Sequence, residues 1–369
     1  MKPTALKRFE NELEILDENS QLRNFPQARA AAEPARIADF SHNSYLNLHE
    51  NAEINERARE LCEDNLFGAL ASRLVMQNTP LFERLEETVC NWKNCSDVLI
   101  FNSGFTANLG IIQAIANAKT AVFSDRLNHA SIVDGIRLSG AQHFRFNHCD
   151  YRHLEDLLYS CTSSEKLIVS DVIFSMDGDM ADVAQLIEIS ERYGAFLLLD
   201  EAHCVDCENI LPLRDNVLIM GTLSKTLAGM GAYLQCGDTV KKYLINKCRP
   251  LVFSTALPRS VLAWNIAAIE YLVKNKDLGK KLLGKAESFR QKLKKIGVNC
   301  GQSQSQIIPI IAGSNENALN LSKTFLKNGI YIPAIRPPTV PVNTARCRIS
   351  LNPRLNDETE EKIISVCSK

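Results

Sequence analysis

The sequence has 369 residues, 45% hydrophobic and 23% charged, the profile of an ordinary globular protein long enough for more than one domain. Its 42 basic and 43 acidic residues leave a net charge of −1, so bulk electrostatics do not support a nucleic-acid or anionic-membrane role. The charged N-terminal stretch has no signal-peptide core, and no apolar run approaches the ~18 residues of a membrane span, so we expect a cytoplasmic protein.

The first two thirds of the chain alternate between helix and strand patterns. After an amphipathic start and a proline-containing loop, TPLFERLEETVCNW (79–92) predicts a helix with Thr79 as N-cap and Pro80 at its first position. Helix-like stretches such as 179–192 separate short apolar runs: DVLIF, TAVFS, HFRFN, KLIVSDVIF, AFLLLD, NVLIM and AYLQC. Such uniformly apolar strands indicate an α/β fold whose sheet is mostly parallel and covered on both faces by helices.

The pattern changes after residue 260. A long helical stretch follows, with Gly279 and Gly284 as possible breaks, and then the strand-like QIIPIIA, a helix near 315–327 and the strand-like RCRISLN. The predicted division is an N-terminal helix and loop segment (1–40), a large domain (41–275) and a small C-terminal α+β domain (276–369).

The twelve cysteines are scattered, and we expect most of them to be reduced, buried thiols: Cys62, Cys90, Cys236, Cys300 and Cys347. Two pairs differ from the rest. Cys90 and Cys95 lie five residues apart at the end of a predicted helix, and Cys204 and Cys207 form a C-x-x-C directly after a histidine. A zinc site needs a second ligand pair, which the sequence does not show, so we expect no metal.

Polar residues follow five of the apolar strands. The segments are FNSGFTAN (101–108), DRLNHAS (125–131), FSMDGD (174–179), LLLDEAH (197–203) and GTLSKT (221–226). Ligands of open α/β sheets bind at the carboxyl ends of the strands, so these segments predict one shared pocket.

Within these segments, individual residues have both chemical and plain structural explanations. Gly104 opens a helix whose first N–H groups suit a phosphate, although Ser-Gly is also a common turn. His129 lies at a strand-to-helix junction with Asn128 as a good cap, and it could be incidental there. DEAH matches a helicase box, but the phosphate loop that a helicase needs is missing.

Lys225 in GTLSKTLAGMGAY is the discriminating residue. Lysine is rarely buried unless paired, and a desolvated lysine has a lowered pKa and becomes a nucleophile. We expect the glycines that follow it, Gly229 and Gly231, to make room for a cofactor. Together with the carboxylate of Asp200 and a phosphate-binding turn, this lysine matches the parts of a pyridoxal phosphate (PLP) site.

The whole set of motifs resembles the α-oxoamine synthases, which are fold-type I PLP enzymes. The matching segments run in order along almost the whole chain: FSHNSYLNL, FNSGFTAN, DRLNHASIVDGIRLSGA, FSMDGD, DEAH, GTLSKTLAGMGAY, RPLVFSTALP and RPPTVPVNTARCRISL. The resemblance implies a homodimeric fold-type I PLP-dependent transferase that condenses an amino acid with an acyl thioester and releases CO₂. It implies no nucleic-acid or membrane partner.

The resemblance also implies roles for the residues around the cofactor ring. Lys225 would hold PLP as a Schiff base and then act as base and acid at the amino acid Cα. Asp200 would pair with the pyridinium nitrogen, His203 would hydrogen-bond the ring hydroxyl, and His129 would stack on the ring.

Further residues would bind the phosphate and the substrates. On the phosphate side these are Gly104, Phe105, Ser175, Thr222 and, across a dimer interface, Thr255. On the substrate side they are Asn43, His129, Thr339 and Arg348, the last holding the amino acid carboxylate.

The choice of substrates rests mainly on IRPPTVP and TARCRIS. These segments most resemble the branch that joins L-alanine to a pimeloyl thioester, on CoA or an acyl carrier protein, in biotin synthesis. The chain departs from the family at Met76-Gln77 (usually Ser-Gly), at Phe82 (usually His) and in the short stretch after DEAH, which leaves the acyl partner open. A relative using another amino acid or acyl group, or a catalytically silent paralogue, are the alternatives.

Overall fold

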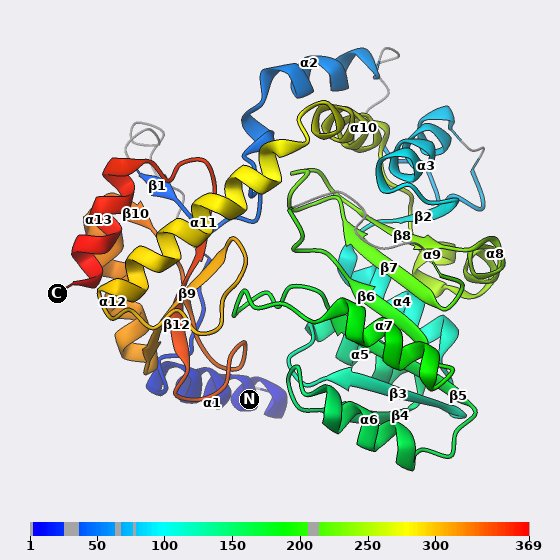
Figure 1. The fold of residues 1–369 in the computed structure, drawn as a ribbon, viewed down its shortest axis with the longest axis horizontal. Coiled ribbons are helices and arrows are strands. Elements are labelled where there is room, and N and C mark those ends of the chain that lie inside the picture. Colours follow the sequence, from blue (N-terminus) through cyan, green and yellow to red (C-terminus); the bar gives the residue numbers. More distant parts are fainter. Residues whose placement is uncertain (1–2, 26–36, 63–67, 77–78, 206–213, 369) are drawn as a thin grey trace. The chain divides into compact units, whose positions relative to one another are not determined.

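The computed structural model describes residues 3–25, 37–62, 68–76, 79–205 and 214–368, and Figure 1 shows its elements in chain order. The chain forms two compact units. The large unit comprises Asn43–Ser175 and Asp179–Lys281, and the small unit comprises Met1–His42, Met176–Gly178 and Leu282–Lys369.

The large unit is built on a seven-stranded sheet with strand order β2-β8-β7-β6-β5-β3-β4. Its strands are β2 (Asp97–Phe101), β3 (Thr120–Asp125), β4 (Gln142–Phe146), β5 (Glu165–Asp171), β6 (Phe196–Asp200), β7 (Val217–Thr222) and β8 (Ala232–Cys236). Among them β8 runs antiparallel to both of its neighbours, and the other pairs are parallel. The predicted, mostly parallel sheet is confirmed.

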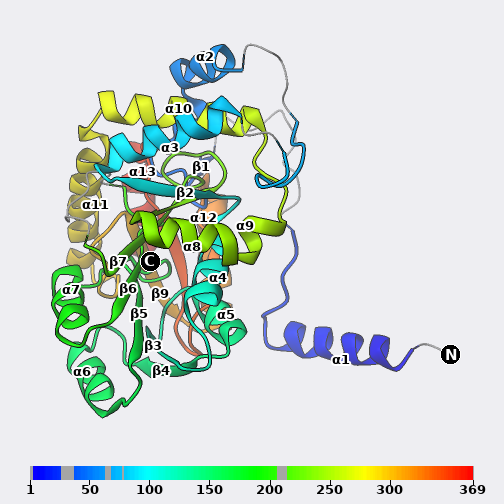
Figure 2. The ribbon, with the colours of Figure 1, turned by 90° about the vertical axis from the view of Figure 1, so that its right-hand side faces the viewer.

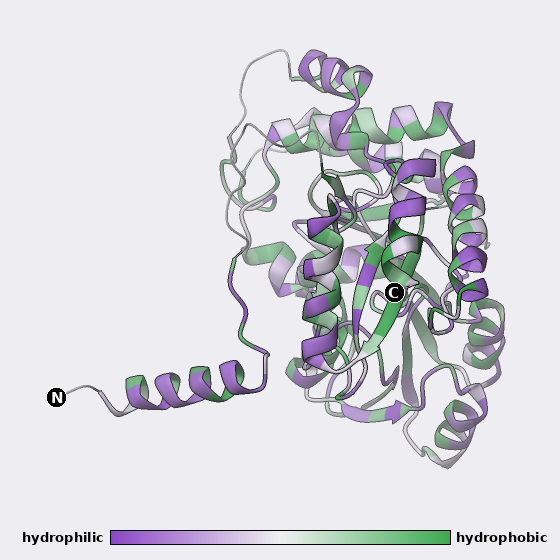
Figure 3. Ribbon diagram, turned by 90° about the vertical axis from the view of Figure 1, so that its left-hand side faces the viewer, coloured by the Kyte–Doolittle hydropathy of each residue, from purple (hydrophilic) through white to green (hydrophobic). Residues whose placement is uncertain are grey.

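Helices cover both faces of this sheet (Figure 2). One face packs against α4 (Gly104–Ile115), α5 (Ala130–Ser139) and α8 (Asp238–Lys247), and the other against α6 (Tyr151–Ser160) and α7 (Val183–Arg192). Alternate residues of one strand enter opposite cores, as a period of two requires: Leu198 belongs to the first core, and Leu197 and Leu199 to the second. Figure 3 colours the ribbon by hydropathy and shows the helix beside the labelled N-terminus as mostly hydrophilic, with apolar residues between.

The remaining helices of the large unit are a 3₁₀ helix (Leu48–Glu50), α2 (Ala52–Glu60), α3 (Pro80–Lys93), α9 (Arg249–Phe253) and α10 (Arg259–Lys274). Thr79 is the N-cap of α3 and Pro80 its first residue, as predicted, but the Thr79 side chain makes no capping bond. The predicted helix at 179–192 begins only at Val183, because Asp182 caps it through the Gln185 amide.

The long predicted helix breaks at a different place from the one expected. It divides into α10, which ends at Lys274, and α11 (Asp277–Lys295), so the break is not at Gly279 or Gly284. The Asn275 N–H donates to the carbonyls of two α10 residues, and its amide side chain also binds one of them, which ends the helix there. Both glycines continue α11, since a helix tolerates an interior glycine at a cost of only about 1 kcal/mol.

The small unit holds a three-stranded antiparallel sheet of β9 (Ile307–Gly313), β12 (Ala345–Ser350) and β11 (Ala334–Ile335), and a parallel pair of β1 (Ala38–Asp39) with β10 (Ile330–Tyr331). Its further helices are α1 (Thr4–Glu18), α12 (Asn315–Lys327) and α13 (Asp357–Cys367). The predicted helix at 315–327 and both predicted strands are confirmed. None of the described helices is long and apolar enough to cross a membrane.

His148 forms ion pairs with two aspartates of the large unit. His148, just after β4, hydrogen-bonds Asp125 at 3.0 Å through Nδ1 and Asp179 at 2.5 Å through Nε2. Burial alone would lower its pKa, but the hydrogen bonds to these carboxylates outweigh that effect and raise the pKa of His148 to about 12. Asp125, His148 and Cys149 also offer ligand atoms within 4.8 Å of one another, yet both ring nitrogens are already used by carboxylates.

Replacing this histidine is expected to destabilise the fold. His148→Ala should lower the free energy of unfolding by about 3 kcal/mol, because it leaves two poorly exposed carboxylates without their shared cation. Since the pKa is raised in the folded state, the stabilisation is fully present below the unfolded value near ~6.5 and falls as the pH rises towards 12.

Urea denaturation at pH 6 and pH 9 measures this effect. The midpoint difference between wild type and His148→Ala should be larger at pH 6. The control is His143→Ala, which removes one neutral hydrogen bond to Ser124 and should cost about 1 kcal/mol. Equal losses for the two variants at both pH values would contradict the ion-paired assignment.

Candidate active site

A hydrogen-bonded chain begins at the lysine singled out in the sequence. Lys225 Nζ lies 2.9 Å from His203 Nε2, and His203 Nδ1 lies 2.6 Å from the Tyr45 hydroxyl. The hydroxyl in turn donates to Asn43 Oδ1 at 3.2 Å. Both ring nitrogens of His203 are satisfied if Lys225 donates to Nε2 and Nδ1–H donates to the Tyr45 oxygen. The structure therefore links Lys225, His203 and Asn43 through Tyr45.

The turn that carries Lys225 connects β7 to β8. The Leu223 N–H donates to the Gly231 carbonyl at 3.0 Å, which closes the turn, and Gly231 has a left-handed φ of 115°. A Cβ on Gly229 would lie 2.0 Å from the side-chain oxygen of Asn265. The expectation that these glycines make room for a cofactor is wrong: packing inside the unit and backbone conformation require them.

Asp200 ends β6 and is 4% exposed. Its carboxylate accepts hydrogen bonds from Asn108 Nδ2 at 2.7 Å and from the Ala202 N–H at 2.9 Å. Asp171 lies opposite it in the register of β5 and β6. Burial and the neighbouring Asp200 carboxylate raise the pKa of Asp171 well above its usual range, which favours the neutral form of the Asp171 carboxyl.

The Asn108 amide ties Asp200 to His129. It donates a second hydrogen bond to Ser131 Oγ at 3.1 Å, and this oxygen lies 2.7 Å from His129 Nδ1. Burial lowers the pKa of His129, which keeps the imidazole neutral near pH 7. A neutral, oriented ring is what stacking on a cofactor requires.

The start of α5 differs from the prediction. His129 itself is the N-cap, accepting from the Ser131 N–H through Nδ1, and Asn128 does not cap the helix. Asn128 instead bridges to β5, donating to the Val169 carbonyl and accepting from the Asp171 N–H. The His129 N–H donates to Asp171, so this loop is fastened to the neighbouring strand.

The predicted phosphate side centres on the N-terminus of α4. Ser103 caps this helix through the Thr106 N–H, and Gly104 and Phe105 form its first turn, where N–H groups have no intrahelical partner. A Cβ at Gly104 would lie 3.8 Å from the Thr222 Cβ, which places Thr222 beside this turn. The Phe105 ring contacts His129 edge-on, with centroids 6.2 Å apart.

Two other predicted phosphate ligands, Thr255 and Ser175, belong to segments of the chain outside the first turn of α4. The Thr255 carbonyl accepts a 2.6 Å hydrogen bond from Asn102, just before the α4 cap, and Thr255 is exposed. Ser175 is half-buried after Phe174 in the segment that follows β5. Their contacts with a phosphate stay predictions.

The remaining predicted substrate residues belong to the small unit. Arg348 in β12 is 4% exposed and donates to Ser350 Oγ at 2.5 Å. Thr339 is exposed and accepts a hydrogen bond from Arg23 at 2.9 Å. Their roles towards a substrate stay predictions.

The departures from the family pattern are only partly described. Phe82 is buried, and the Arg73 guanidinium lies 4.7 Å from its ring centroid, so an aromatic core contact stands where the family has histidine. Gln77, Cys207 and the stretch from 206 to 213 lie outside the described residues. Among the cysteines predicted to be buried, Cys90 is only half-buried.

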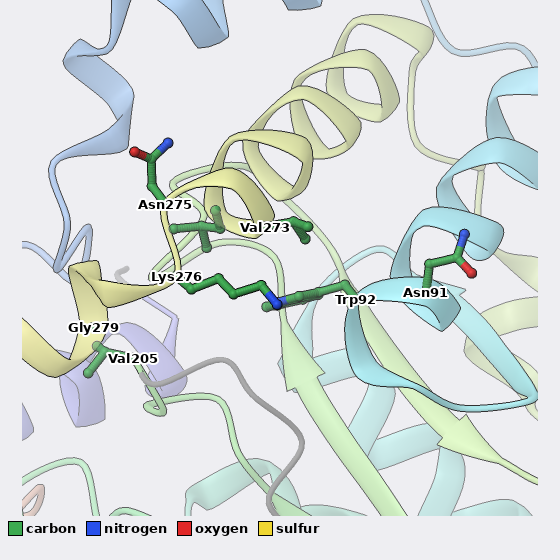
Figure 4. Close-up of a pocket in the computed structure, with 8 residues that line it drawn as sticks. Asn91, Trp92, Val205, Val273, Asn275, Lys276 and Gly279 are labelled. Carbon is green, nitrogen blue, oxygen red and sulfur yellow. The ribbon is translucent and has the colours of Figure 1, made fainter.

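A separate cavity of about 110 Å³ lies between α3 and the end of α10 (Figure 4). Trp92 and Lys276 line it, and none of the predicted site residues does. It is smaller than the ~300–1,000 Å³ of typical small-molecule sites. We therefore place the active site at the strand ends and not in this cavity.

The residues at the strand ends fit pyridoxal phosphate. Both hydrogen bonds that Asp200 accepts from described residues come from neutral donors, so a cationic ring nitrogen would supply its missing counter-charge. The buried Asn108 Oδ1 has no hydrogen-bond partner, and the first turn of α4 offers N–H groups to a phosphate. The amine of Lys225 is the group that would bind the cofactor covalently.

Four residues of this site were not singled out from the sequence: Tyr45, Asn108, Ser131 and Asp171. Three of them lie inside quoted motifs, in FSHNSYLNL, FTAN and NHAS, and the fourth ends the IVSD strand. For Asn108 and Asp171 the available signal was a polar residue in a largely apolar helix or strand.

Comparison with known proteins identifies the family of the chain. The chain matches the family described as Aminotransferase class I and II over residues 35–366. A Bacillus cereus (strain Q1) protein provisionally named 8-amino-7-oxononanoate synthase is 42% identical over 368 residues, covering 95% of this chain and 93% of the relative.

Two solved structures share the fold. A serine palmitoyltransferase from S. paucimobilis with bound PLP has a TM-score of 0.88 at 22% identity, covering 100% of this chain and 98% of that one. An 8-amino-7-oxononanoate synthase from Francisella tularensis has a TM-score of 0.76 at 23% identity, covering 90% and 97%. The predicted fold class is confirmed, and the chain belongs to the aminotransferase class I and II family as a PLP-dependent transferase of the α-oxoamine synthase type.

Proposed function

We propose that this enzyme joins L-alanine to a pimeloyl thioester, releasing CO₂ and the free thiol and forming 8-amino-7-oxononanoate. The observation that carries the proposal is the chain from Lys225 through His203 to Tyr45, set at the same strand ends as Asp200. The names of relatives about 42% identical and the IRPPTVP segment support the choice of substrates.

The residues divide the chemistry between them. PLP, when bound, supplies an electron sink for the carbanion at the amino acid Cα. Lys225 would anchor it through Nζ and then move the Cα proton, with His203 Nε2 fixing the direction of the amine. Asp200 would pair with the protonated ring nitrogen, and His129 would cover one face of the ring.

Further residues would recognise the substrates. Arg348 would bind the amino acid carboxylate in a charge-assisted pair, with Asn43 and Thr339 lining the substrate side. The acyl group would reach the carbanion on CoA or on an acyl carrier protein.

A homodimer forms part of the proposal. Thr255 is exposed, and we infer that it reaches the phosphate bound by a second copy of the chain. Helix α1 has no buried residue and carries exposed apolar side chains at Leu6, Phe9 and Leu13, which supports an additional surface between copies.

The substrate assignment is tested with the holoenzyme and matched substrate pairs. Alanine, glycine and serine are each combined with pimeloyl-, acetyl- and palmitoyl-CoA, and products are identified by mass and by CO₂ release. Alanine with pimeloyl-CoA should give a kcat/KM at least ~10-fold above the other pairs, since one methylene is worth about 10–200-fold in discrimination. Preference for glycine with acetyl-CoA, or for serine with palmitoyl-CoA, would move the enzyme to another branch.

Lys225→Ala should lower condensation activity by at least ~10³-fold, because it removes both the cofactor anchor and the group that moves the Cα proton. Steady-state kinetics with excess PLP measure the loss. The control, Lys242→Ala, removes an exposed lysine that pairs with Asp238 and should leave activity unchanged. Activity of Lys225→Ala within tenfold of wild type would contradict the assignment.

Asn108→Ala should lower kcat by about 10–100-fold with little change in KM, because it breaks both hydrogen bonds that orient Asp200 and Ser131. The matched control is Asn216→Ala. Asn216 also donates two side-chain hydrogen bonds, to Ser190 and Ala195, but just before β7 begins. If the two variants lose kcat equally, Asn108 has only a structural role.

A further inference from the structure

The C-terminal turn of α3 places two cysteines against each other. Asn94 has left-handed backbone angles (φ 48°, ψ 52°), and the Cys95 N–H donates to the Cys90 carbonyl at 3.0 Å. This is the Schellman arrangement, in which the side chain two residues past the helix meets the side chain one turn before its end. That contact is usually apolar, and here both side chains are thiols.

The pKa values of the two thiols also point to this contact, because the interaction of each thiol with the other shifts both pKa values. The Cys90 thiol donates a 3.7 Å hydrogen bond to the Ser96 carbonyl. Both cysteines are half-buried, and the residues beside Cys95 in the turn, Asn94 and Ser96, are exposed. A small molecule can therefore reach the pair.

The two thiols are chemically unequal. The hydrogen bond from Cys95, followed by the charge of Lys241, lowers the pKa of Cys90, whereas the same hydrogen bond and burial raise the pKa of Cys95. Cys236, which lies opposite Asp97 in the β2–β8 register, is fully buried, and burial raises its pKa to about 12. The lowered pKa favours Cys90 as the thiol that reacts first.

The turn is held in place by a buried ion pair. Lys93, the last residue of α3, is 2% exposed and lies 2.8 Å from Glu201, so the helix end has little freedom. Within the described residues no group of three metal-binding side chains includes either cysteine. Fixed proximity favours reaction between the two sulfurs over binding of an ion.

We propose that Cys90 and Cys95 are a reversible disulfide-forming site that reacts with small-molecule disulfides. The Cys90 thiolate attacks one sulfur of oxidised glutathione and expels a glutathione thiolate. Cys95 then loses its proton and attacks the Cys90 sulfur, expelling the second glutathione. Two protein thiols are oxidised, and one disulfide is reduced to two thiols. The site is independent of the proposed function, because the disulfide is detected by peptide mapping and not by enzyme turnover.

Peptide mapping tests this site in the native holoenzyme. After incubation with oxidised glutathione, remaining thiols are blocked with N-ethylmaleimide, and the protein is denatured and digested with trypsin. Cleavage after Lys93 separates the cysteines, so the disulfide should appear as peptides 85–93 and 94–119 joined, two hydrogens lighter than their sum. Dithiothreitol should release them.

Variants identify the order of attack. Cys95→Ser should stop at a glutathione adduct on Cys90, and Cys161→Ser, which removes a half-buried cysteine in another part of the unit, should leave the cross-link unchanged. Recovery of wild-type Cys90 and Cys95 as blocked thiols, or as separate glutathione adducts, would overturn the proposal.

Discussion

The site depends on the burial of one negative charge at the end of β6. Asp171 and Asp200 lie opposite each other on adjacent parallel strands, each 4% exposed, and two carboxylates so placed cannot both be ionised cheaply. The raised pKa of Asp171 relieves the conflict, because it favours a neutral Asp171 carboxyl beside Asp200. A buried carboxylate with only neutral donors is a strong binding site for a cationic ring nitrogen, which is the electronic requirement of PLP chemistry.

This one charge organises the residues around it. Asn108 from α4 holds Asp200 with one N–H and Ser131 with the other, and Ser131 in turn fixes the imidazole of His129. The ring that would stack on the cofactor and the carboxylate that would hold its nitrogen are thereby set by a single amide. Because Asn108 is 1% exposed, losing either bond would leave a buried polar group unsatisfied.

The sequence predicted the architecture and the principal residues for a physical reason. Strands buried on both faces must be apolar throughout, so the polar residues at their ends, such as Asp200 and Lys225, were conspicuous. It could not predict which of two competing hydrogen bonds a polar side chain would form. Asn128 is a good helix cap, but its amide bonds to β5 instead, and the histidine next to it became the cap. The end of α10 was set by Asn275, since asparagine also ends helices, and not by the nearby glycines.

Packing also explains residues whose role a sequence motif alone does not reveal. The glycines after Lys225 suggested space for a ligand, yet Gly229 and Gly231 are required by Asn265 and by a left-handed backbone. Tyr45 shows the opposite case. It is fully buried and was not singled out from the sequence, but its hydroxyl contacts His203 Nδ1 and so helps to direct the His203 ring towards the lysine amine.

The central claim is that Lys225 is the covalent anchor of PLP at these strand ends. Borohydride reduction of the holoenzyme, followed by trypsin digestion and mass spectrometry, tests it most directly. The account predicts the added mass of a reduced pyridoxyl phosphate on the peptide spanning 215–241, at Lys225. Label on a different lysine, or no label on a protein saturated with the cofactor, would contradict it.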